Sequence, residues 1–322
     1  MIKNAKPRNK ALLMTALAVF FSSAASAAWP EHAITYVVPY PPGGTNDSAA
    51  RIVAQGLEKE LGQPVVVENR PGAGGTVGAA YVAHAKPDGY TLFNASIGNV
   101  AIAPQLVPAN FDPFKDFTPL AHIGGSRSVI AVNPNLPIHS VKELISYAKA
   151  NPGKLTYGTS GNGTPGNISM EYFKLLSGTD ILHVPYKGSA AALSDAVAGH
   201  IDVVSDPLAN GFVNSGKLRG LAFFGTEKAE DLHGVPSITQ RYPQWKFSGS
   251  FIALAPAKTP APVLAQLRDS YHAVLSDPQV VKSLENIGVT PEWKTPQQTD
   301  ELVRATWDIS KEIIKKAHIQ AN

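Results

Sequence analysis

The sequence predicts an α/β protein of two lobes that are joined by two crossover strands at a hinge. Strand and helix patterns alternate along most of the chain, which is typical of sheets covered by helices. Without a predicted leader of 28 residues, 294 of the 322 residues remain, more than one hydrophobic core usually serves. We expect the leader over 1–28, the first lobe over 29–127 and 249–322, and the second lobe over 128–248.

The first 28 residues have the pattern of a cleavable signal peptide. Four basic residues between Lys3 and Lys10 precede an apolar core over 11–21, and small residues follow to Ala28. The apolar core is about half as long as the roughly 20 residues that span a membrane. The chain contains no cysteine, which removes disulfides, thiolate metal ligands and the lipidated cysteine that tethers many exported proteins. We therefore predict an exported protein, free in the periplasm and not lipidated.

The leader also accounts for the basic charge of the chain. The full sequence has a formal net charge of +3, but 24 basic and 25 acidic residues remain when the four basic residues of the leader are removed. No stripe of lysine or arginine remains to indicate a nucleic acid partner or a membrane surface. The nine histidines form no His-Glu-x-x-His pattern and no close pair. The sequence thus predicts neither a metal site nor a cofactor.

In the first lobe, each strand pattern leads into a loop of glycines or small polar residues. We expect strands over 34–38, 64–68 and 90–93, a helix that is capped by Thr45, Asn46 or Asp47 and ends at Leu61, and a second helix that ends near His84. Gly43 and Gly44 lie in the first loop and Ser96 in the last. Alternation of this kind predicts a parallel sheet, and ligands of such proteins bind beyond the carboxyl ends of the strands.

The second lobe repeats this organisation. Its expected elements are a crossover strand over 128–132, a helix with a Ser140/Glu143 capping box that ends at Ala150, a strand near 155–157, a helix from Pro165 to about Leu176, a strand over 181–184, a helix from Ser189 to Gly199, a strand over 201–204 that leads to Asp206, and a strand over 218–224.

The chain then returns to the first lobe. A strand pattern over 247–255 is followed by helical patterns over 262–275, 278–287 and from 299 to about 318, with apolar residues three or four positions apart. The two crossings form a hinge, and a hinge between lobes with facing loops acts as a clamp.

The loop at 156–167, TYGTSGNGTPGN, indicates the kind of ligand. It joins a strand to a helix whose N-cap is Thr164 and whose first residue is Pro165, and it contains four glycines. Unpaired backbone N–H groups and the helix dipole at such a helix start favour an anion. The loop after the first strand has the same composition. Two anion sites in one chain predict an acidic ligand that is held from both sides.

Four long segments carry a resemblance to a known family. They are WPEHAITYVVPYPPGGTNDSAAR, VVVENRPGAGGTVGAAYVAHAKPDGYTL, LTYGTSGNGTPGN and HVPYKGSAAALSDAVAGHIDV. In their residues, order and spacing they resemble the periplasmic solute-binding proteins of tripartite tricarboxylate transporters, also called Bug or TctC-like receptors. The resemblance covers essentially all of the chain after the leader. It implies a type II-like periplasmic-binding-protein fold, no chemical turnover, and a carboxylate held between the lobes for a membrane permease.

Carried over by position, the resemblance implies a set of ligand-binding residues in loops of both lobes. Asn167 stands where family members often have a histidine, and the family varies at the positions of Ser205 and Asp206. The predicted site residues are Tyr40, Gly44, Thr45, Asn46, Asp47, Ser96, Ser160, Gly161, Asn162, Gly163, Thr164, Asn167, Tyr186 and Asp206. We expect Asp47 either to meet the ligand or only to cap its helix, and Asp206 either to line the cleft or only to form a turn.

The loops contain no arginine, so backbone N–H groups and Ser, Thr and Asn side chains are expected to hold the acid. Two facing anion sites suit a dicarboxylate, and Tyr40, Tyr186 and Ile97 as a flat wall favour an aromatic one such as terephthalate. We expect a monomer. An exported hydrolase of a carboxylate ester and a periplasmic sensor input domain are the alternatives.

The sequence also contains two partial motifs of enzymes and nucleotide-binding proteins. Gly161-x-Gly163-x-x-Gly166 fits the dinucleotide fingerprint, but the next strand ends without the acidic residue that holds a ribose. Ser160 lies in GTSGN, which departs from the Gly-x-Ser-x-Gly elbow of hydrolases. Both patterns therefore favour the anion-binding loop over these alternatives.

Overall fold

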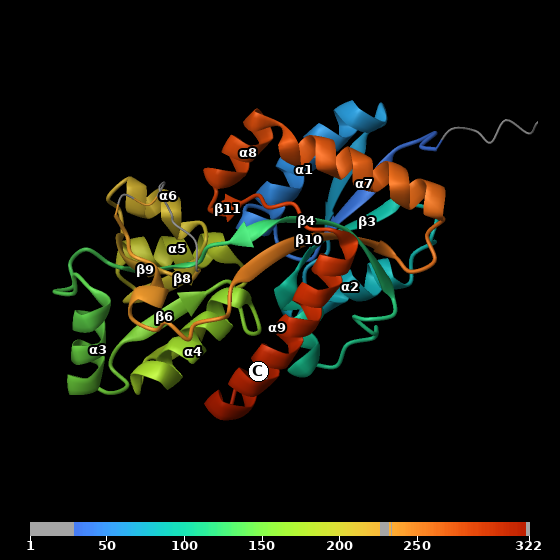
Figure 1. The fold of residues 1–322 in the computed structure, drawn as a ribbon. Coiled ribbons are helices and arrows are strands. Elements are labelled where there is room, and N and C mark those ends of the chain that lie inside the picture. The colour runs from blue at the N-terminus through green and yellow to red at the C-terminus, as the bar shows by residue number, and fades with distance from the viewer. Residues whose placement is uncertain (1–28, 226–231, 233, 320–322) are drawn as a thin grey trace, which may run out of the picture.

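The structure is a computed structural model in which residues 29–225, 232 and 234–319 are described. The predicted signal peptide at 1–28 lies outside these residues. Two sheets, each flanked by helices, form two lobes that lie side by side (Figure 1). Within the described residues, no helix is long and apolar enough to cross a membrane.

The first lobe is built on a six-stranded sheet of order β11-β4-β10-β3-β1-β2. Its strands are β1 (Ile34–Val38), β2 (Val65–Asn69), β3 (Thr91–Ser96), β4 (Phe117–Ser126), β10 (Gly249–Pro256) and β11 (Val289–Thr290). Its helices are α1 (Thr45–Leu61), α2 (Thr76–Ala83), α7 (Ala261–Ser276) and α8 (Pro278–Glu285). Two apolar cores belong to this lobe, one containing Ile34 and Leu57 and the other containing Val37 and Phe93.

The second lobe is built on a five-stranded sheet of order β7-β6-β8-β5-β9. Its strands are β5 (Val129–Val132), β6 (Thr156–Thr159), β7 (Leu182–Pro185), β8 (Val203–Asp206) and β9 (Arg219–Phe223). Its helices are α3 (Val141–Ala150), α4 (Pro165–Ser177), α5 (Ser189–Ala198) and α6 (Ala209–Asn214). Two cores again belong to the lobe, around Phe173 and Trp245 and around Leu193 and Phe223.

The chain passes from the first sheet to the second between β4 and β5 and returns between β9 and β10. The predicted boundaries at 127/128 and 248/249 fall in these two connections, and we propose them as the limits of the lobes. The last helix, α9 (Pro296–Ala317), joins both lobes. Its Val303 belongs to a core of the first lobe, whereas its Ile313 belongs to a core of the second.

Both sheets are mixed, so the prediction of parallel sheets was wrong in part. β1 is parallel to β2 and β3, but β10 runs antiparallel to β3 and β4. In the second lobe, β6 is parallel to β7 and β8, but β5 is antiparallel to β8 and β9. β5 and β10 are the first strands after the two crossings, and the short β11 also runs antiparallel to its neighbour β4. The helix-connected parallel strands still end at the face between the lobes, so their loops meet there.

Several predicted helix starts differ from the structure. The N-cap of α1 is Gly44, not one of the three residues after it, because Thr45 already has a helical conformation. α9 begins at Pro296, three residues earlier than predicted, behind a capping box of Thr295 and Gln298. At α3 the Ser140 Oγ accepts from the Glu143 N–H, but the Glu143 carboxylate accepts from the His139 N–H, so the predicted capping box is half formed.

Candidate functional site

Two adjoining cavities lie between the lobes, at the carboxyl ends of the parallel strands. The inner cavity has a volume of about 50 Å³ and the outer cavity about 500 Å³. Both are lined by Tyr40, Pro41, Ser160 and Thr164, so they form one continuous cleft. The inner cavity is otherwise lined mainly by polar residues of both lobes: Thr45, Asn46, Ser96, Ser126, Ser128, Ser189 and Asp206.

The outer cavity has a different character. Most of its walls are glycine or apolar: Pro39, Pro71, Gly72, Ala73, Gly74, Gly75, Ala103, Leu106, Val107, Gly161, Pro185 and Tyr186. Its charged lining residue among those described is Lys187. The cleft therefore offers a small polar inner end and a larger, mostly apolar outer chamber.

Loops of the two lobes touch across this cleft. A Cβ atom on Gly163 would lie 3.2 Å from the Leu106 Cδ1 of the other lobe, and one on Gly44 would lie 3.7 Å from the Ser189 Oγ. Gly163 also has φ +69°, in the left-handed region that favours glycine. The loops of the two lobes thus lie against each other, and glycine at these positions lets them approach.

In the first lobe, Asn46 at the start of α1 lines the inner cavity. The Asn94 side-chain amide donates to the Asn46 Oδ1 at 3.1 Å and to the Asn46 backbone oxygen at 3.0 Å. The Asn94 Oδ1 in turn accepts from the buried Tyr36 hydroxyl at 2.7 Å. These consecutive hydrogen bonds fix the orientation of the Asn46 amide. The Asn46 Nδ2 has no hydrogen-bond partner among the described residues. Asn46 therefore holds two donors ready for an acceptor in the cleft.

Asp47 lies behind this loop and lines neither cavity. Its carboxylate accepts from the Gly43 N–H at 3.0 Å, from Asn69 at 2.8 Å and from two nitrogens of Arg51 at 3.0 Å each. Burial by itself raises the pKa of Asp47, but the bonds from Arg51, Gly43 and Asn69 outweigh it and lower that pKa. The carboxylate ties the loop to α1 and β2. Its negative charge also stabilises the positive end of the α1 helix dipole from inside the lobe.

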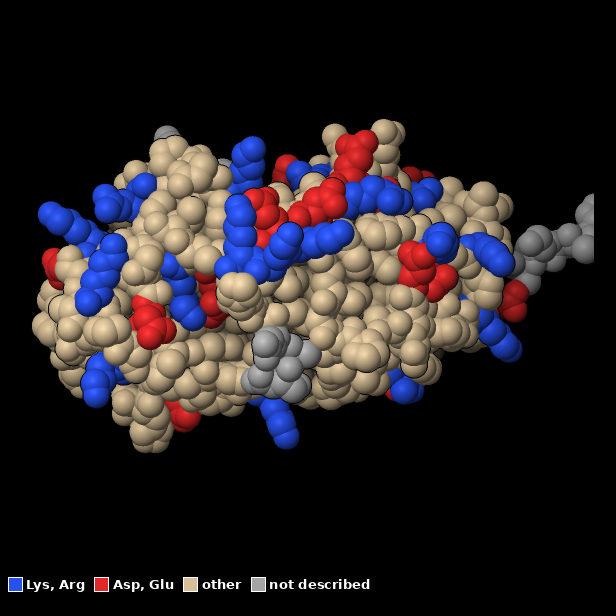
Figure 2. All heavy atoms as spheres, turned by 90° about the horizontal axis from the view of Figure 1, so that it is seen from below, with Lys and Arg blue, Asp and Glu red and all other residues tan. Residues whose placement is uncertain are grey.

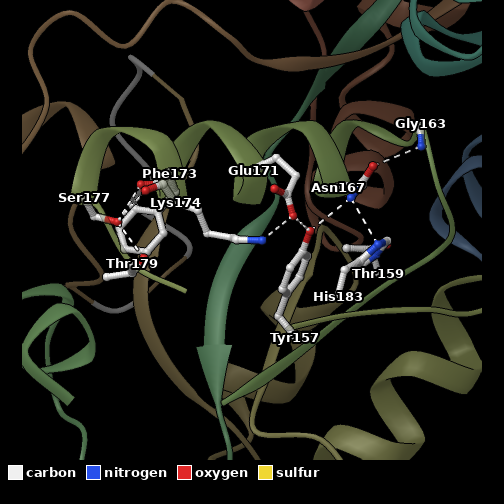
Figure 3. A network of polar contacts seen from close by, with 10 residues as sticks. All are labelled: Tyr157, Thr159, Gly163, Asn167, Glu171, Phe173, Lys174, Ser177, Thr179 and His183. Atoms are coloured by element: carbon white, nitrogen blue, oxygen red, sulfur yellow. Dashed lines mark hydrogen bonds and ion pairs between the residues drawn. The ribbon is translucent and has the colours of Figure 1, made fainter. Parts of the chain in front are cut away.

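In the second lobe, Asn167 positions the loop before α4 (Figure 3). Its Oδ1 accepts from the Gly163 N–H at 3.1 Å, and its Nδ2 donates to the Tyr157 hydroxyl and to the His183 Nδ1. Because that Nδ1 accepts, the His183 Nε2 carries the hydrogen and donates to the Thr159 Oγ1 at 2.8 Å. Asn167 is 2% exposed and lines neither cavity. It therefore supports the loop at 156–167, the anion loop of the second lobe, from the side away from the cavities.

The same network extends into a partly buried ion pair. The Tyr157 hydroxyl donates to the Glu171 carboxylate, which also binds the Lys174 Nζ at 2.8 Å. Burial and then the positive charge of Lys174 lower the pKa of His183 to about 4, so its ring is neutral at physiological pH. Figure 3 shows these side chains on α4 and the adjacent strands, next to the loop that carries Gly163.

Two tyrosines flank the cleft in different ways. The Tyr40 hydroxyl is buried next to Asn99 and Ser96, and burial raises its pKa to about 12. The Tyr186 hydroxyl donates to Asp195 at 2.7 Å, outside the cleft, while the residue lines the outer cavity. Tyr186 thus gives the outer cavity an aromatic wall.

Asp206, the last residue of β8, places a carboxyl group in the inner cavity. It is 1% exposed, and its Oδ1 accepts from the Leu208 N–H at 2.9 Å. Burial raises the pKa of Asp206 to about 6, while Ser189, the Leu208 N–H and Thr45 act in the opposite direction. Thr45 belongs to the other lobe, so this carboxyl lies where the lobes meet.

The structure brings eleven of the fourteen predicted residues to the cleft. Tyr40, Gly44, Thr45, Asn46, Ser96, Ser160, Thr164 and Asp206 line the inner cavity, and Gly161, Asn162 and Tyr186 line the outer one. Asp47, Gly163 and Asn167 line neither cavity. The N-cap of α4 is Thr164 as predicted, but its hydroxyl donates to the Gly161 oxygen at 2.7 Å and accepts no hydrogen bond from the N–H groups of the first helical turn.

The sequence reasoning missed several lining residues. Ser128 follows the first crossing, and Ser189 starts α5. Lys187, in the loop between β7 and α5, belongs to the segment 183–188 that the resemblance places at the border of the cleft. The start of α5 repeats the pattern of a strand, a glycine and a helix start, and that pattern could have identified Ser189. Ser128 has no comparable signal, because its place depends on how β5 leaves the first sheet.

The donors that face the cleft, and the lack of charge on most of its walls, suit the capture of an acid. Among the described residues, no group of three or more His, Cys, Asp or Glu side chains is placed to hold a metal ion. On the face in Figure 2, basic and acidic side chains lie next to one another, so this face carries no broad stripe of one sign.

Known proteins resemble this chain in sequence and in fold. The sequence model of the tripartite tricarboxylate transporter family receptor matches residues 49–319. BugT of Bordetella pertussis is 33% identical over 302 residues, which are 90% of this chain and 93% of BugT. A Rhodopseudomonas palustris protein solved with adipate has a TM-score of 0.86 at 34% identity and covers 91% of this chain and 99% of its own. MatC of the same organism, solved with bound malate, has a TM-score of 0.81 at 29% identity, with 88% and 99% covered.

Proposed function

Because the chain belongs to the tripartite tricarboxylate transporter receptor family, we propose that it captures an organic carboxylate between its lobes and delivers it to the permease of such a transporter. The protein works in the periplasm after removal of the predicted signal peptide, without a lipid anchor. It is a monomer that binds its ligand and does not transform it.

The oriented Asn46 amide in the inner cavity carries this proposal. Its two N–H groups have no partner among the described residues, although the Asn46 Nδ2 is buried. A buried donor without a partner costs free energy, which an anionic acceptor would recover. The N-termini of α1 and α4 border the same space and add backbone N–H groups and favourable helix dipoles. The inner cavity is therefore a binding site for a carboxylate.

Capture follows from closure of the lobes. The open protein admits the acid to Thr45 and Asn46, and closure brings the loop from Ser160 to Thr164 onto it from the second lobe. Micromolar affinity needs about 8 kcal/mol, which several charge-assisted hydrogen bonds and the burial of the ligand body supply after the cost of closure. The permease recognises the closed form.

We propose a dicarboxylate as the ligand. The inner cavity has room for one carboxylate, and the outer cavity of about 500 Å³ holds the body and the second acidic group. Lys187 at the outer cavity supplies a positive charge for that group. The solved relatives with adipate and malate support this class. An aromatic member of the class, terephthalate, would lie against Tyr186 and the proline walls.

The test is a binding screen with purified mature protein. Thermal shift against mono-, di- and tricarboxylates, including succinate, malate, adipate, citrate, benzoate and terephthalate, selects binders, because a molecule that binds only the native state raises the melting temperature. Isothermal titration then gives the affinity, and small-angle scattering with and without ligand reports closure. The proposal expects micromolar binding of a dicarboxylate without conversion. If no acid shifts the melting temperature at millimolar concentration, the proposal is wrong.

A further inference from the structure

Asp206 is a carboxyl group inside a cavity that is otherwise furnished with hydrogen-bond donors. The inner cavity presents the Asn46 amide and the hydroxyl groups of Thr45, Ser128 and Ser189, and Asp206 is the acidic side chain among its described lining residues. A ligand carboxylate bound by Asn46 lies in the same space of about 50 Å³. Any further polar group of the ligand near that carboxylate therefore meets Asp206.

The surroundings of Asp206 contain no compensating cation among the described residues. Tyr40 is the other titratable residue that lines the inner cavity, and Lys187 lines only the outer one. On α1, Asp47 faces away and is paired with Arg51. The Leu208 N–H donates to Asp206, the Thr45 and Ser189 side chains lie near it, and its pKa of about 6 leaves it mostly ionised at pH 7.5.

From this arrangement we infer that Asp206 is a specificity-determining residue that selects acids carrying a hydroxyl or ammonium group next to the carboxylate. The inference rests on the proposed function, because it assumes that a carboxylate occupies the inner cavity. It narrows the ligand from dicarboxylates in general to 2-hydroxy and 2-amino dicarboxylates.

The physical reason for this selection is that a hydrogen must lie between the ligand and the Asp206 carboxylate. Two ionised carboxylates a few ångströms apart repel each other, so one of them takes up a proton or the pair is disfavoured. A hydroxyl or ammonium group brings its own hydrogen and donates it to the Asp206 carboxylate. Such a charge-assisted bond forms without a proton from solvent. A plain acid leaves that acceptor without a new partner.

The experiment compares acids that differ at one position. Succinate, malate and aspartate carry hydrogen, hydroxyl and ammonium at the same carbon, and glutarate, 2-hydroxyglutarate and glutamate extend the series by one carbon. Terephthalate and 2-hydroxyterephthalate cover the aromatic case for the hydroxyl group. Each affinity is measured by isothermal titration at pH 7.5 with the wild type, with Asp206→Asn and Asp206→Ala, and with Asp180→Asn as matched control. Asp180 is exposed on the same lobe, and its replacement by Asn removes the same charge at a position away from the cleft.

The inference expects the hydroxyl or ammonium acid of a series to bind roughly 10- to 150-fold more tightly than its plain acid. Asp206→Asn brings this ratio of affinities close to one for the ammonium acid and strengthens the binding of the plain acid, which lacks the hydroxyl or ammonium group. Asp180→Asn leaves the ratio unchanged. Circular dichroism melts verify that each variant is folded, and Asp206→Ala repeats the test without a new amide.

Two outcomes would overturn the inference. In the first, a plain acid binds as tightly as its derivatives and Asp206→Asn leaves the ratio unchanged. In the second, a plain acid binds with uptake of one proton, seen as a dependence of the binding heat on buffer ionisation, because Asp206 then serves as a proton carrier. In both cases a carboxylate still binds and the proposed function stands. If none of these acids or the wider panel binds, the proposed function itself fails.

Discussion

Replacement of Asn46 should weaken ligand binding far more than it weakens the fold. Asn46→Ala removes the two N–H groups that face the inner cavity and the oxygen that accepts from Asn94. The second bond of Asn94, to the Asn46 backbone oxygen at 3.0 Å, does not depend on the side chain and remains. The two effects can therefore be separated.

The size of each effect follows from these bonds. A hydrogen bond to a charged group contributes about 1.5–3 kcal/mol, so the loss of one such bond to the ligand raises Kd roughly 10- to 150-fold. The loss of one neutral bond from Asn94 lowers the free energy of unfolding by about 1 kcal/mol. Asn46→Asp keeps the acceptor for Asn94 but replaces the donors with a negative charge. It should bind the acid more weakly than Asn46→Ala.

The assay is isothermal titration with a dicarboxylate that binds the wild type, together with urea unfolding of each variant without ligand. Asn286→Ala, an exposed asparagine at the end of α8, serves as matched control and should bind like the wild type. If Asn46→Asp binds the acid as tightly as the wild type, the amide does not donate to a ligand carboxylate. The reasoning on the inner cavity would then be refuted.

Three further perturbations test the second lobe. The folded-state pKa of His183 lies near 4, below the ordinary 6.5, so between these two pH values the unfolded chain binds more protons than the folded protein. The contribution of neutral His183 to the free energy of unfolding is therefore complete above about pH 6.5 and is lost as the pH falls toward 4. Urea midpoints of the wild type should fall over this range and those of His183→Gln less steeply; parallel curves would contradict this. Tyr157→Phe removes the donor to Glu171 and the acceptor of Asn167, and we expect a loss of about 1–3 kcal/mol in the free energy of unfolding; an unchanged urea midpoint would speak against the network. Gly163→Val places a branched side chain against the opposite lobe at a positive φ, so small-angle scattering should show no compaction on ligand addition; normal closure would disprove the contact.

Much of the fold follows from local signals in the sequence. Strand and helix patterns such as those of β1 and α4 depend on the spacing of apolar residues, on Thr164 and Pro165 at a helix start, and on Gly199 at a helix end. The start of α9 was placed three residues late because Pro296 at the first helical position was not recognised. β4 was not predicted, because Pro119 and two glycines interrupt its pattern and its pairing with β10 supplies what the local sequence lacks.

In the candidate site, too, some features follow from local sequence and others depend on contacts between distant elements. Loops with several glycines before a helix start are visible in one sequence and predict where an anion binds, and the family resemblance supplied the individual residues. The roles of Asp47 and Asn167 were not visible, because both are polar residues of the first helical turn, just as Asn46 is. Whether such a side chain faces the cleft or the lobe depends on its partners, and these come from β2, β6 and β7.

By itself, the sequence predicted two lobes, the start of α4 and an acidic ligand, because each prediction depends on residues that are neighbours in the chain. Only the tertiary structure decided that Asp206 meets Thr45 and that Asn94 orients Asn46. These pairs lie far apart in the sequence, on different strands and helices, and the packing of the sheets brings them together. Hydrogen bonds act over about 3 Å, so a pattern of residue types cannot specify them until the fold fixes the distances.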